Sequence, residues 1–217
     1  MTKNIWISKN ANKNLIEYFE RRDINVNILN QSNVVYNQIS THPDIYMCKL
    51  GVNNTSPVFW GNKSKISYSY PGNIIYNACS TGKYFIHNLK YTDKDLLYTA
   101  TSLNQELINI KQGYAKCNIL PINENSIITS DLGIAKKCSN LDVLIISPGH
   151  IKLKGFDTGF IGGTSGIIDG TVVFNGDLSS HPDFKKIKDF ITNKGLCIKY
   201  FDSYPLEDIG SIIYEEK

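Results

Sequence analysis

The chain has 217 residues, 41% hydrophobic and 20% charged, which is enough for a buried core and argues against a disordered polymer. A net charge of +3 at pH 7 is too small to indicate nucleic acid or an anionic membrane surface as a partner. No apolar run approaches the roughly 20 residues of a membrane-spanning helix. Since residues 1–6 lead into a strand pattern rather than a signal peptide, we expect a cytoplasmic protein.

Four segments share one order of predicted elements: a short apolar strand, a polar helical stretch and a second strand. In the last of them, Ser180 and Asp183 have the spacing of a capping box. Phe184, Ile187 and Ile191 would then form one buried helix face. The opening strands are expected at 5–8, 84–88, 126–130 and 171–175, and the second strands at 26–29, 107–110, 143–147 and 196–201.

After each second strand, a turn leads into a third strand. The one in the middle of the chain would place Cys117 on an alternating strand, between Ala115 and Ile119. These turn-led strands are expected at 42–48, 113–120, 162–168 and 208–214.

The spacing of the opening strands predicts a repeat. The last three begin about 42 and about 45 residues apart, whereas the first gap is almost twice as long, so a unit with little or no helix is expected between 52 and 82. We expect an α/β protein closed into a ring, with helices outside and turn-led strands meeting at the centre. A solenoid would need polar capping repeats, which the sequence lacks. The prediction is a single domain over 1–217 with units of approximately 3–51, 52–82, 83–124, 125–169 and 170–217.

Three short motifs resemble those of the guanidine-modifying-enzyme, or pentein, superfamily. Residues 43–47 (PDIYM) are similar to the PDxxF strand of dimethylarginine dimethylaminohydrolases, residues 151–155 (IKLKG) to their LHLKS/T strand, and residues 206–213 to the closing GGxxC strand. This distant resemblance implies a five-bladed pseudo-symmetric α/β propeller of repeated strand–helix–strand–strand units. Residues 42–44, 112–117 and 159–163 are also similar to an uncharacterised clostridial-type family of that fold.

The chain departs from the superfamily where the resemblance implies catalysis. Guanidine hydrolysis there uses a cysteine thiolate, a histidine acid/base and carboxylates that hold the cationic nitrogens. This sequence has Lys152 in place of the histidine, Ser211 in the closing strand with no cysteine after it, and Cys48-Lys49-Leu50 in place of an acidic pair. A lysine would repel a guanidinium cation. Hydrolysis by the standard residues is therefore not expected.

Polar residues of the central turns are the candidates for chemistry. A Cys117 nucleophile could pair across the ring with His42 as base, with Asp44 or Asp208 orienting the histidine. Lys116 beside the cysteine would lower its pKa. The alternatives remain open that Cys117 is a core thiol and that His42 only shapes the turn before a proline. The expected ligand-binding residues are Asn77, Tyr114, Lys116, Lys152, Thr164, Ser165, Asp208 and Ser211.

Neither a metal nor a cofactor is expected. The five cysteines are scattered without zinc-site spacing and are interpreted as reduced thiols. The glycines from Gly159 to Gly170 do not form a phosphate-binding loop motif. They are expected to permit close backbone approach at the axis, where exposed amides beside Thr164 and Ser165 could hold an anion.

Three functions are compatible with the sequence. The leading hypothesis is a pentein-fold protein that binds a small polar or anionic molecule in a central cavity. The second is a cysteine-nucleophile hydrolase or transferase of altered mechanism, acting on an amidine, amide or amine. The third is a non-catalytic protein-interaction module, with the 13 tyrosines as anchors. No nucleic-acid or membrane partner is expected, and the oligomeric state stays open.

Overall fold

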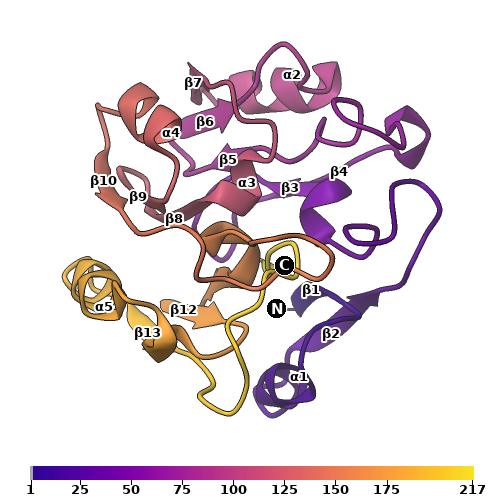
Figure 1. The fold of residues 1–217 in the computed structure, drawn as a ribbon. Helices are drawn as coiled ribbons and strands as arrows, with labels where there is room; N and C mark the ends of the chain where they lie inside the picture. The colour runs from indigo at the N-terminus through magenta and orange to yellow at the C-terminus, as the bar shows by residue number, and fades with distance from the viewer. Residues whose placement is uncertain (1) are drawn as a thin grey trace.

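The computed structural model describes residues 2–217, and the strands of that part of the chain form five small sheets (Figure 1). Four sheets have three strands, and the fifth contains only β3 (Met47–Lys49) and β4 (Val58–Trp60). Helices and strands alternate along the chain, which confirms the expected α/β class.

The four three-stranded sheets share one pattern, in which a strand, a helix and a parallel strand are joined by an antiparallel third strand. The parallel pairs are β1 (Lys3–Ser8) with β2 (Asn25–Leu29), β6 (Tyr84–His87) with β7 (Glu106–Asn109), β9 (Ser126–Thr129) with β10 (Asp142–Ile145), and β12 (Thr171–Phe174) with β13 (Cys197–Lys199). The helices between them are α1 (Lys13–Glu20), α2 (Lys94–Ser102), α4 (Leu132–Lys137) and α5 (Phe184–Thr192). The antiparallel third strands are β14 (Ile213–Glu216), β5 (Cys79–Ser80), β8 (Ile119–Asn123) and β11 (Ser165–Ile168).

Strand pairing crosses the unit boundaries expected from the sequence. The antiparallel strands β5, β8 and β11 each pair with the opening strand that follows in the chain, so that β5 pairs with β6, β8 with β9 and β11 with β12. The last strand, β14, pairs with β1 at the other end of the chain. The C-terminal segment therefore completes the first sheet.

The inner strands contact one another in chain order: β3 with β5, β5 with β8, β8 with β11, and β11 with β14. Met47 and Val58 then pack with Ile213 in one cluster, which joins the two-stranded sheet to β14. Helices α1, α2, α4 and α5 lie at the periphery, whereas the short helix α3 (Ala115–Asn118) lies near the centre (Figure 1).

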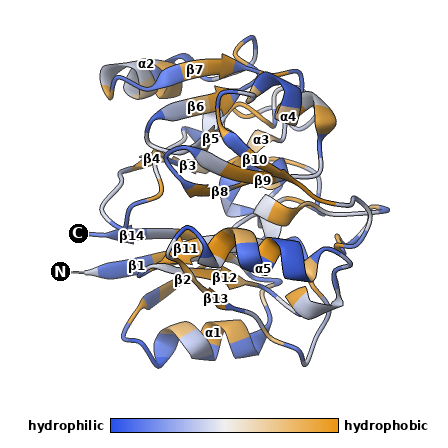
Figure 2. Cartoon of the chain, turned by 90° about the vertical axis from the view of Figure 1, so that its left-hand side faces the viewer, coloured by the Kyte–Doolittle hydropathy of each residue, from blue (hydrophilic) through white to orange (hydrophobic). Residues whose placement is uncertain are grey.

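The outer helices form because one face of each is apolar, and the first turns of α1, α2 and α4 are also capped by a side chain. In α1, the side chain of Asn12 accepts the N–H of Asn14, and Leu15 and Phe19 are buried in one cluster with Ile5 and Ile7. Figure 2 shows the same division in α5, whose apolar and polar residues occupy different faces. Burial of these faces covers the sheets from outside.

Three predicted turn-led strands begin instead with a helical turn, and the one expected at 162–168 begins with the 3₁₀ turn η3 (Ile161–Thr164). Residues 115–118 form α3, so Cys117 lies on a helical turn and not on an alternating strand. The turn forms because the side-chain oxygen of Asn77 accepts the N–H groups of Lys116 and Cys117. Residues 43–45 likewise form the 3₁₀ turn η1 (Pro43–Ile45), with proline at a first-turn position where its missing N–H is not needed.

The predicted capping box is also wrong. Ser180 ends a separate 3₁₀ turn, η4 (Leu178–Ser180), and its hydroxyl donates to the backbone oxygen of Asp177. Asp183 immediately precedes α5, but its carboxylate accepts the N–H of Ser147 rather than capping the helix. Of the helices described in residues 2–217, none is long and apolar enough to cross a membrane.

Candidate functional site

Asp44 is the meeting point of three distant segments. It is fully buried in η1, and one carboxylate oxygen, Oδ2, accepts hydrogen bonds from the Cys117 thiol at 3.0 Å and from the Ser211 hydroxyl at 2.8 Å. We call Asp44, Asn77, Lys116, Cys117 and Ser211 the hub. No donor within residues 2–217 reaches the other oxygen, Oδ1, although it is buried. An unpaired buried acceptor of this kind is uncommon.

Lys116 acts on Ser211 and not on the neighbouring thiol. Its ammonium group donates to the backbone oxygen of Gly162 at 3.0 Å and to the Ser211 hydroxyl at 3.1 Å. Burial and the Asp44 carboxylate raise the pKa of the Cys117 thiol well above its ordinary value. The expectation that Lys116 lowers this pKa is therefore wrong, and the thiol is protonated at neutral pH.

Asn77 positions the thiol from the opposite side. Its side-chain oxygen holds the backbone N–H of Lys116 at 3.0 Å, and its amide nitrogen donates to the sulfur of Cys117 at 3.4 Å. Since Asn77 is fully buried, these bonds fix the direction of both side chains at the start of α3.

Asp208 is a second buried carboxylate close to Asp44. Its two oxygens accept the N–H groups of Phe160 at 3.0 Å and Gly210 at 2.9 Å. Burial, with the charge of Asp44, raises the pKa of Asp208 to about 7. The N–H of Phe160, next to Gly159 at the start of the glycine-rich segment, thus holds the protein's own carboxylate.

His42 is buried against Gly210, which has a φ of +73°. A Cβ at Gly210 would lie 2.0 Å from Cβ of His42, so only glycine fits. Burial lowers the pKa of His42, while Asp44 counteracts this in part, so the ring is neutral at pH 7. Its Nδ1 has no hydrogen-bond partner among the described residues.

A cavity of about 200 Å³ opens beside the hub, and we call it the acid cavity. Its polar lining residues include His42, Cys117 and Asp208. Two tyrosines of its wall, Tyr36 and Tyr114, join their hydroxyls at 2.7 Å. The remaining lining residues are Ile39, Ile45, Leu153, Phe156, Thr158 and Phe160.

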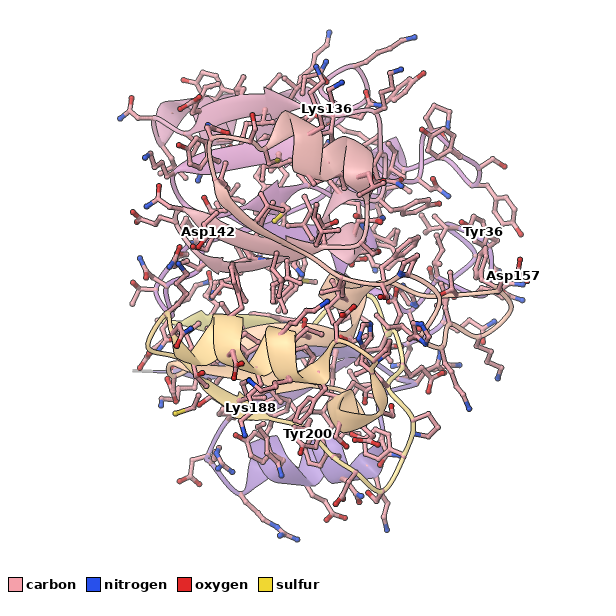
Figure 3. All side chains as sticks on the ribbon, turned by 60° about the vertical axis from the view of Figure 1, so that its left-hand side comes forward. Tyr36, Lys136, Asp142, Asp157, Lys188 and Tyr200 are labelled. Atoms are coloured by element: carbon pink, nitrogen blue, oxygen red, sulfur yellow. The ribbon has the colours of Figure 1, made fainter. Side chains whose placement is uncertain are left out.

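Aromatic rings continue from this wall to the surface. The centroid of the Phe156 ring lies 6.1 Å from that of Tyr36. The exposed ring of Tyr68, on another segment, has its centroid 6.3 Å from the Tyr36 centroid. Figure 3 shows Tyr36 and Asp157, the neighbour of Phe156, on the same side of the molecule. The acid cavity therefore has an aromatic entrance.

Most of the residues expected to bind a ligand come together at the hub or the acid cavity. The exceptions are Thr164 and Ser165, whose hydroxyls both donate to the backbone oxygen of Ile161, and Lys152, which is exposed on the surface beside Glu207. Sequence reasoning missed Tyr36, Phe156 and Phe160, because they lie in segments without a strand or helix pattern. Within residues 2–217, no three His, Cys, Asp or Glu side chains are grouped to hold a metal ion.

Comparisons with known proteins place this geometry in a family and a fold. Residues 53–213 match the family described as "Family of unknown function (DUF6873)". A search of curated proteins gave no match. A crystal structure of a dimethylarginine dimethylaminohydrolase, in an adduct with 4-chloro-2-hydroxymethylpyridine, is similar with a TM-score of 0.52 and 9% identity, over 94% of this chain and 93% of that one. This likeness shows a distant pentein-fold relationship, whereas the clostridial-type resemblance stays a prediction.

Proposed function

The chain belongs to this family of unknown function. We propose that it binds a small molecule with a cationic nitrogen group in the acid cavity. The class of ligand is an amine, amidinium or guanidinium. Binding takes place without guanidine hydrolysis by the standard residues.

The proposed architecture is the five-bladed pseudo-symmetric propeller expected from the repeat. Five sheets, with inner strands that contact one another in chain order, support it. In such a ring, residues far apart in sequence reach a common centre, as Asp44, Cys117 and Ser211 do. The ligand cavity would then lie at one end of the central axis.

The buried carboxylate of Asp208 in the cavity wall is the observation that carries the proposal. A buried carboxylate is costly unless it is paired, and a cation beside Asp208 would relieve this cost and that of Asp44 behind it. His42 lines the cavity, and its Nδ1 has no hydrogen-bond partner within the described chain, as is also true of Oδ1 of the neighbouring Asp44. An anion is disfavoured here, because two carboxylates would repel it.

The aromatic wall supports the same ligand class. Rings attract a cation over their faces, by about 0.5–2 kcal/mol each depending on desolvation. Tyr36, Tyr114, Phe156 and Phe160 supply four rings to the lining of the cavity. The Asp208 carboxylate and the aromatic rings of the same lining together favour an organic cation.

A cysteine-nucleophile enzyme is the second candidate, because Cys117 and His42 line the same cavity. The protonated thiol donates to Asp44 in the ligand-free protein, which does not favour attack. A bound cation would lower the pKa of Cys117 by offsetting the charge of Asp44, so binding would precede any chemistry. The interaction-module hypothesis remains the third candidate.

Three ligands of nearly the same shape test the proposal by calorimetric titration: benzamidine as cation, benzamide as neutral isostere and benzoate as anion. We expect saturable binding of benzamidine at pH 8, with at least tenfold weaker binding of the other two. Equal binding of all three, or preference for benzoate, would overturn the charge argument. No binding of any of them would favour the interaction module instead.

Two variants locate the binding. Asp208→Asn should reduce benzamidine affinity by at least tenfold, because it removes the carboxylate from the cavity wall. Asp202→Asn is the matched control, since Asp202 is exposed and should leave the affinity unchanged. Full binding by a folded Asp208→Asn protein would mean that the ligand occupies another site.

A further inference from the structure

A second pocket lies on the other side of the hub, formed by residues of β3, β8, β11 and β14. Figure 2 shows β14 and both chain ends on one side of the molecule. We call it the lysine pocket, because Lys49 and Lys116 line it and none of its lining residues is acidic in the described chain. Lys116 belongs to α3 together with Cys117, so adjacent residues of one helical turn line the two pockets.

Lys49 is partly buried without an acidic hydrogen-bond partner. Its ammonium group donates to the backbone oxygen of Tyr214 and lies 5.3 Å from the centroid of the Tyr214 ring. The nearby carboxylate, Glu215, accepts the N–H of Val58 and pairs with the ammonium group of Lys217 at 2.9 Å. Lys49 therefore has N–H groups left for a ligand.

Lys116 adds a second positive charge to the lining of the pocket. Two of its three N–H donors go to Gly162 and Ser211, which fixes the ammonium group at the hub. It is thus a fixed source of positive potential, while Lys49 remains able to contact a ligand directly. The rest of the pocket is mainly apolar, with Met47, Leu120, Pro121, Ile167, Ile212 and Ile213 among its lining residues.

We infer that the lysine pocket binds the carboxylate of a small aliphatic acid, with Lys49 as its principal partner. The volume of about 40 Å³ limits the enclosed part of the ligand to a few non-hydrogen atoms, because one water already needs about 10–15 Å³ on such a scale. Positive charge favours an anion, and the apolar walls favour an alkyl chain over a phosphate or sulfate. This inference does not depend on the proposed function of the acid cavity.

Protonation of Lys49 supports this assignment. Burial lowers the pKa of Lys49 to about 8, with Glu215 acting in the opposite direction. The other ionisable groups around it are Cys48, Tyr214 and Lys116 in the lining and the Glu215–Lys217 pair nearby. A carboxylate would stabilise the charged lysine, and its binding would be accompanied by proton uptake near pH 8.

Methionine provides a local probe of this pocket. The chain has two methionines, Met1 and Met47, and Met47 lines the lysine pocket. With ¹³C-methyl methionine in the full chain, we expect butyrate to shift the Met47 methyl signal in a saturable manner at pH 7. Butyramide, its neutral isostere, should leave the signal unchanged. The butyrate concentration should reach about 50 mM, which exceeds a dissociation constant in the low millimolar range, as expected for a weak site. The inference is overturned if butyrate causes no shift at this concentration or if butyramide causes the same shift.

Charge variants complete the experiment. Lys49→Gln should abolish the response to butyrate, Lys49→Arg should retain it, and the exposed control Lys188→Gln should not alter it. Benzamidine binding, measured on the same samples, should be unaffected by Lys49→Gln, which separates the two sites. A butyrate response of Lys49→Gln equal to that of the unmodified protein would show that the lysine is not the partner.

Discussion

The acid cavity and the lysine pocket, which lie on two sides of the hub, differ in the charge that each buries. On one side, Asp208 lies in an aromatic cavity with its pKa raised to about 7; on the other, Lys49 lies in an aliphatic pocket with its pKa lowered to about 8. Both shifts have the same principal cause, desolvation, which disfavours whichever form is charged. Each end therefore favours a ligand of the charge opposite to its own.

The largest expected effect is on stability at the acidic end. The unfolded chain ionises Asp208 near pH 4 and the native protein near pH 7, so the native state holds an extra proton between these values. The free energy of unfolding should then fall with rising pH across this range, by about 4 kcal/mol from this group. Asp208→Asn should remove that fall, measured as the difference between urea unfolding curves of the two proteins. An unchanged pH dependence would mean that the carboxylate is solvated.

The lysine end should show the opposite sign. The unfolded chain keeps Lys49 protonated up to about pH 10.5 and the native protein only up to about pH 8. The free energy of unfolding should rise between these values, by about 3 kcal/mol from this group. Lys49→Gln should remove the rise in the same unfolding measurement. If the rise persists in the variant, other groups cause it.

Cysteine labelling tests the protonated thiol next to the acid cavity. The exposed Cys197 should react with iodoacetamide at pH 7 about a hundredfold faster than the buried Cys117, as measured by mass spectrometry of peptides. Faster labelling of Cys117 than of Cys197 at pH 6 would instead support the cysteine-nucleophile enzyme. Acceleration of Cys117 labelling by benzamidine would show that a cation activates the thiol.

The smallest expected effect is an opposite pH dependence of affinity. Benzamidine should bind about tenfold more tightly at pH 8 than at pH 6, because only ionised Asp208 pairs with it. Butyrate should bind about tenfold less tightly at pH 9 than at pH 7, because Lys49 loses its proton. Isothermal titration at the four pH values measures both trends, and trends of the same sign would contradict the comparison.

Much of the fold could be predicted, because the repeat has strong strand signals. The opening strands at β1, β6, β9 and β12 lie where short apolar runs indicate them. The helical turn at Cys117 could not, since it depends on the side chain of Asn77, which is 40 residues away in the sequence. The pairing of β14 with β1 likewise depends on tertiary closure rather than on local pattern.

The candidate site was predictable in part for the same reason. Asp44, Cys117 and Ser211 follow from the position of the central turns, so the repeat was sufficient to nominate them. Phe156 and Tyr36 face each other from segments without secondary structure, and no periodicity indicates such contacts. Lys49 was noticed only as a departure from a motif, because burial and the absence of a partner are properties of the folded chain.

The closure of the first sheet by β14 has a consequence for synthesis of the protein. Residues 213–216 are synthesised after every other strand described, and until then β1 has a free edge where β14 will pair. A nascent chain would expose that edge, together with the side of Met47 that packs on Ile213, until β14 is made. The first sheet is therefore completed only after the other four, and a chain stalled before residue 213 would be prone to self-association.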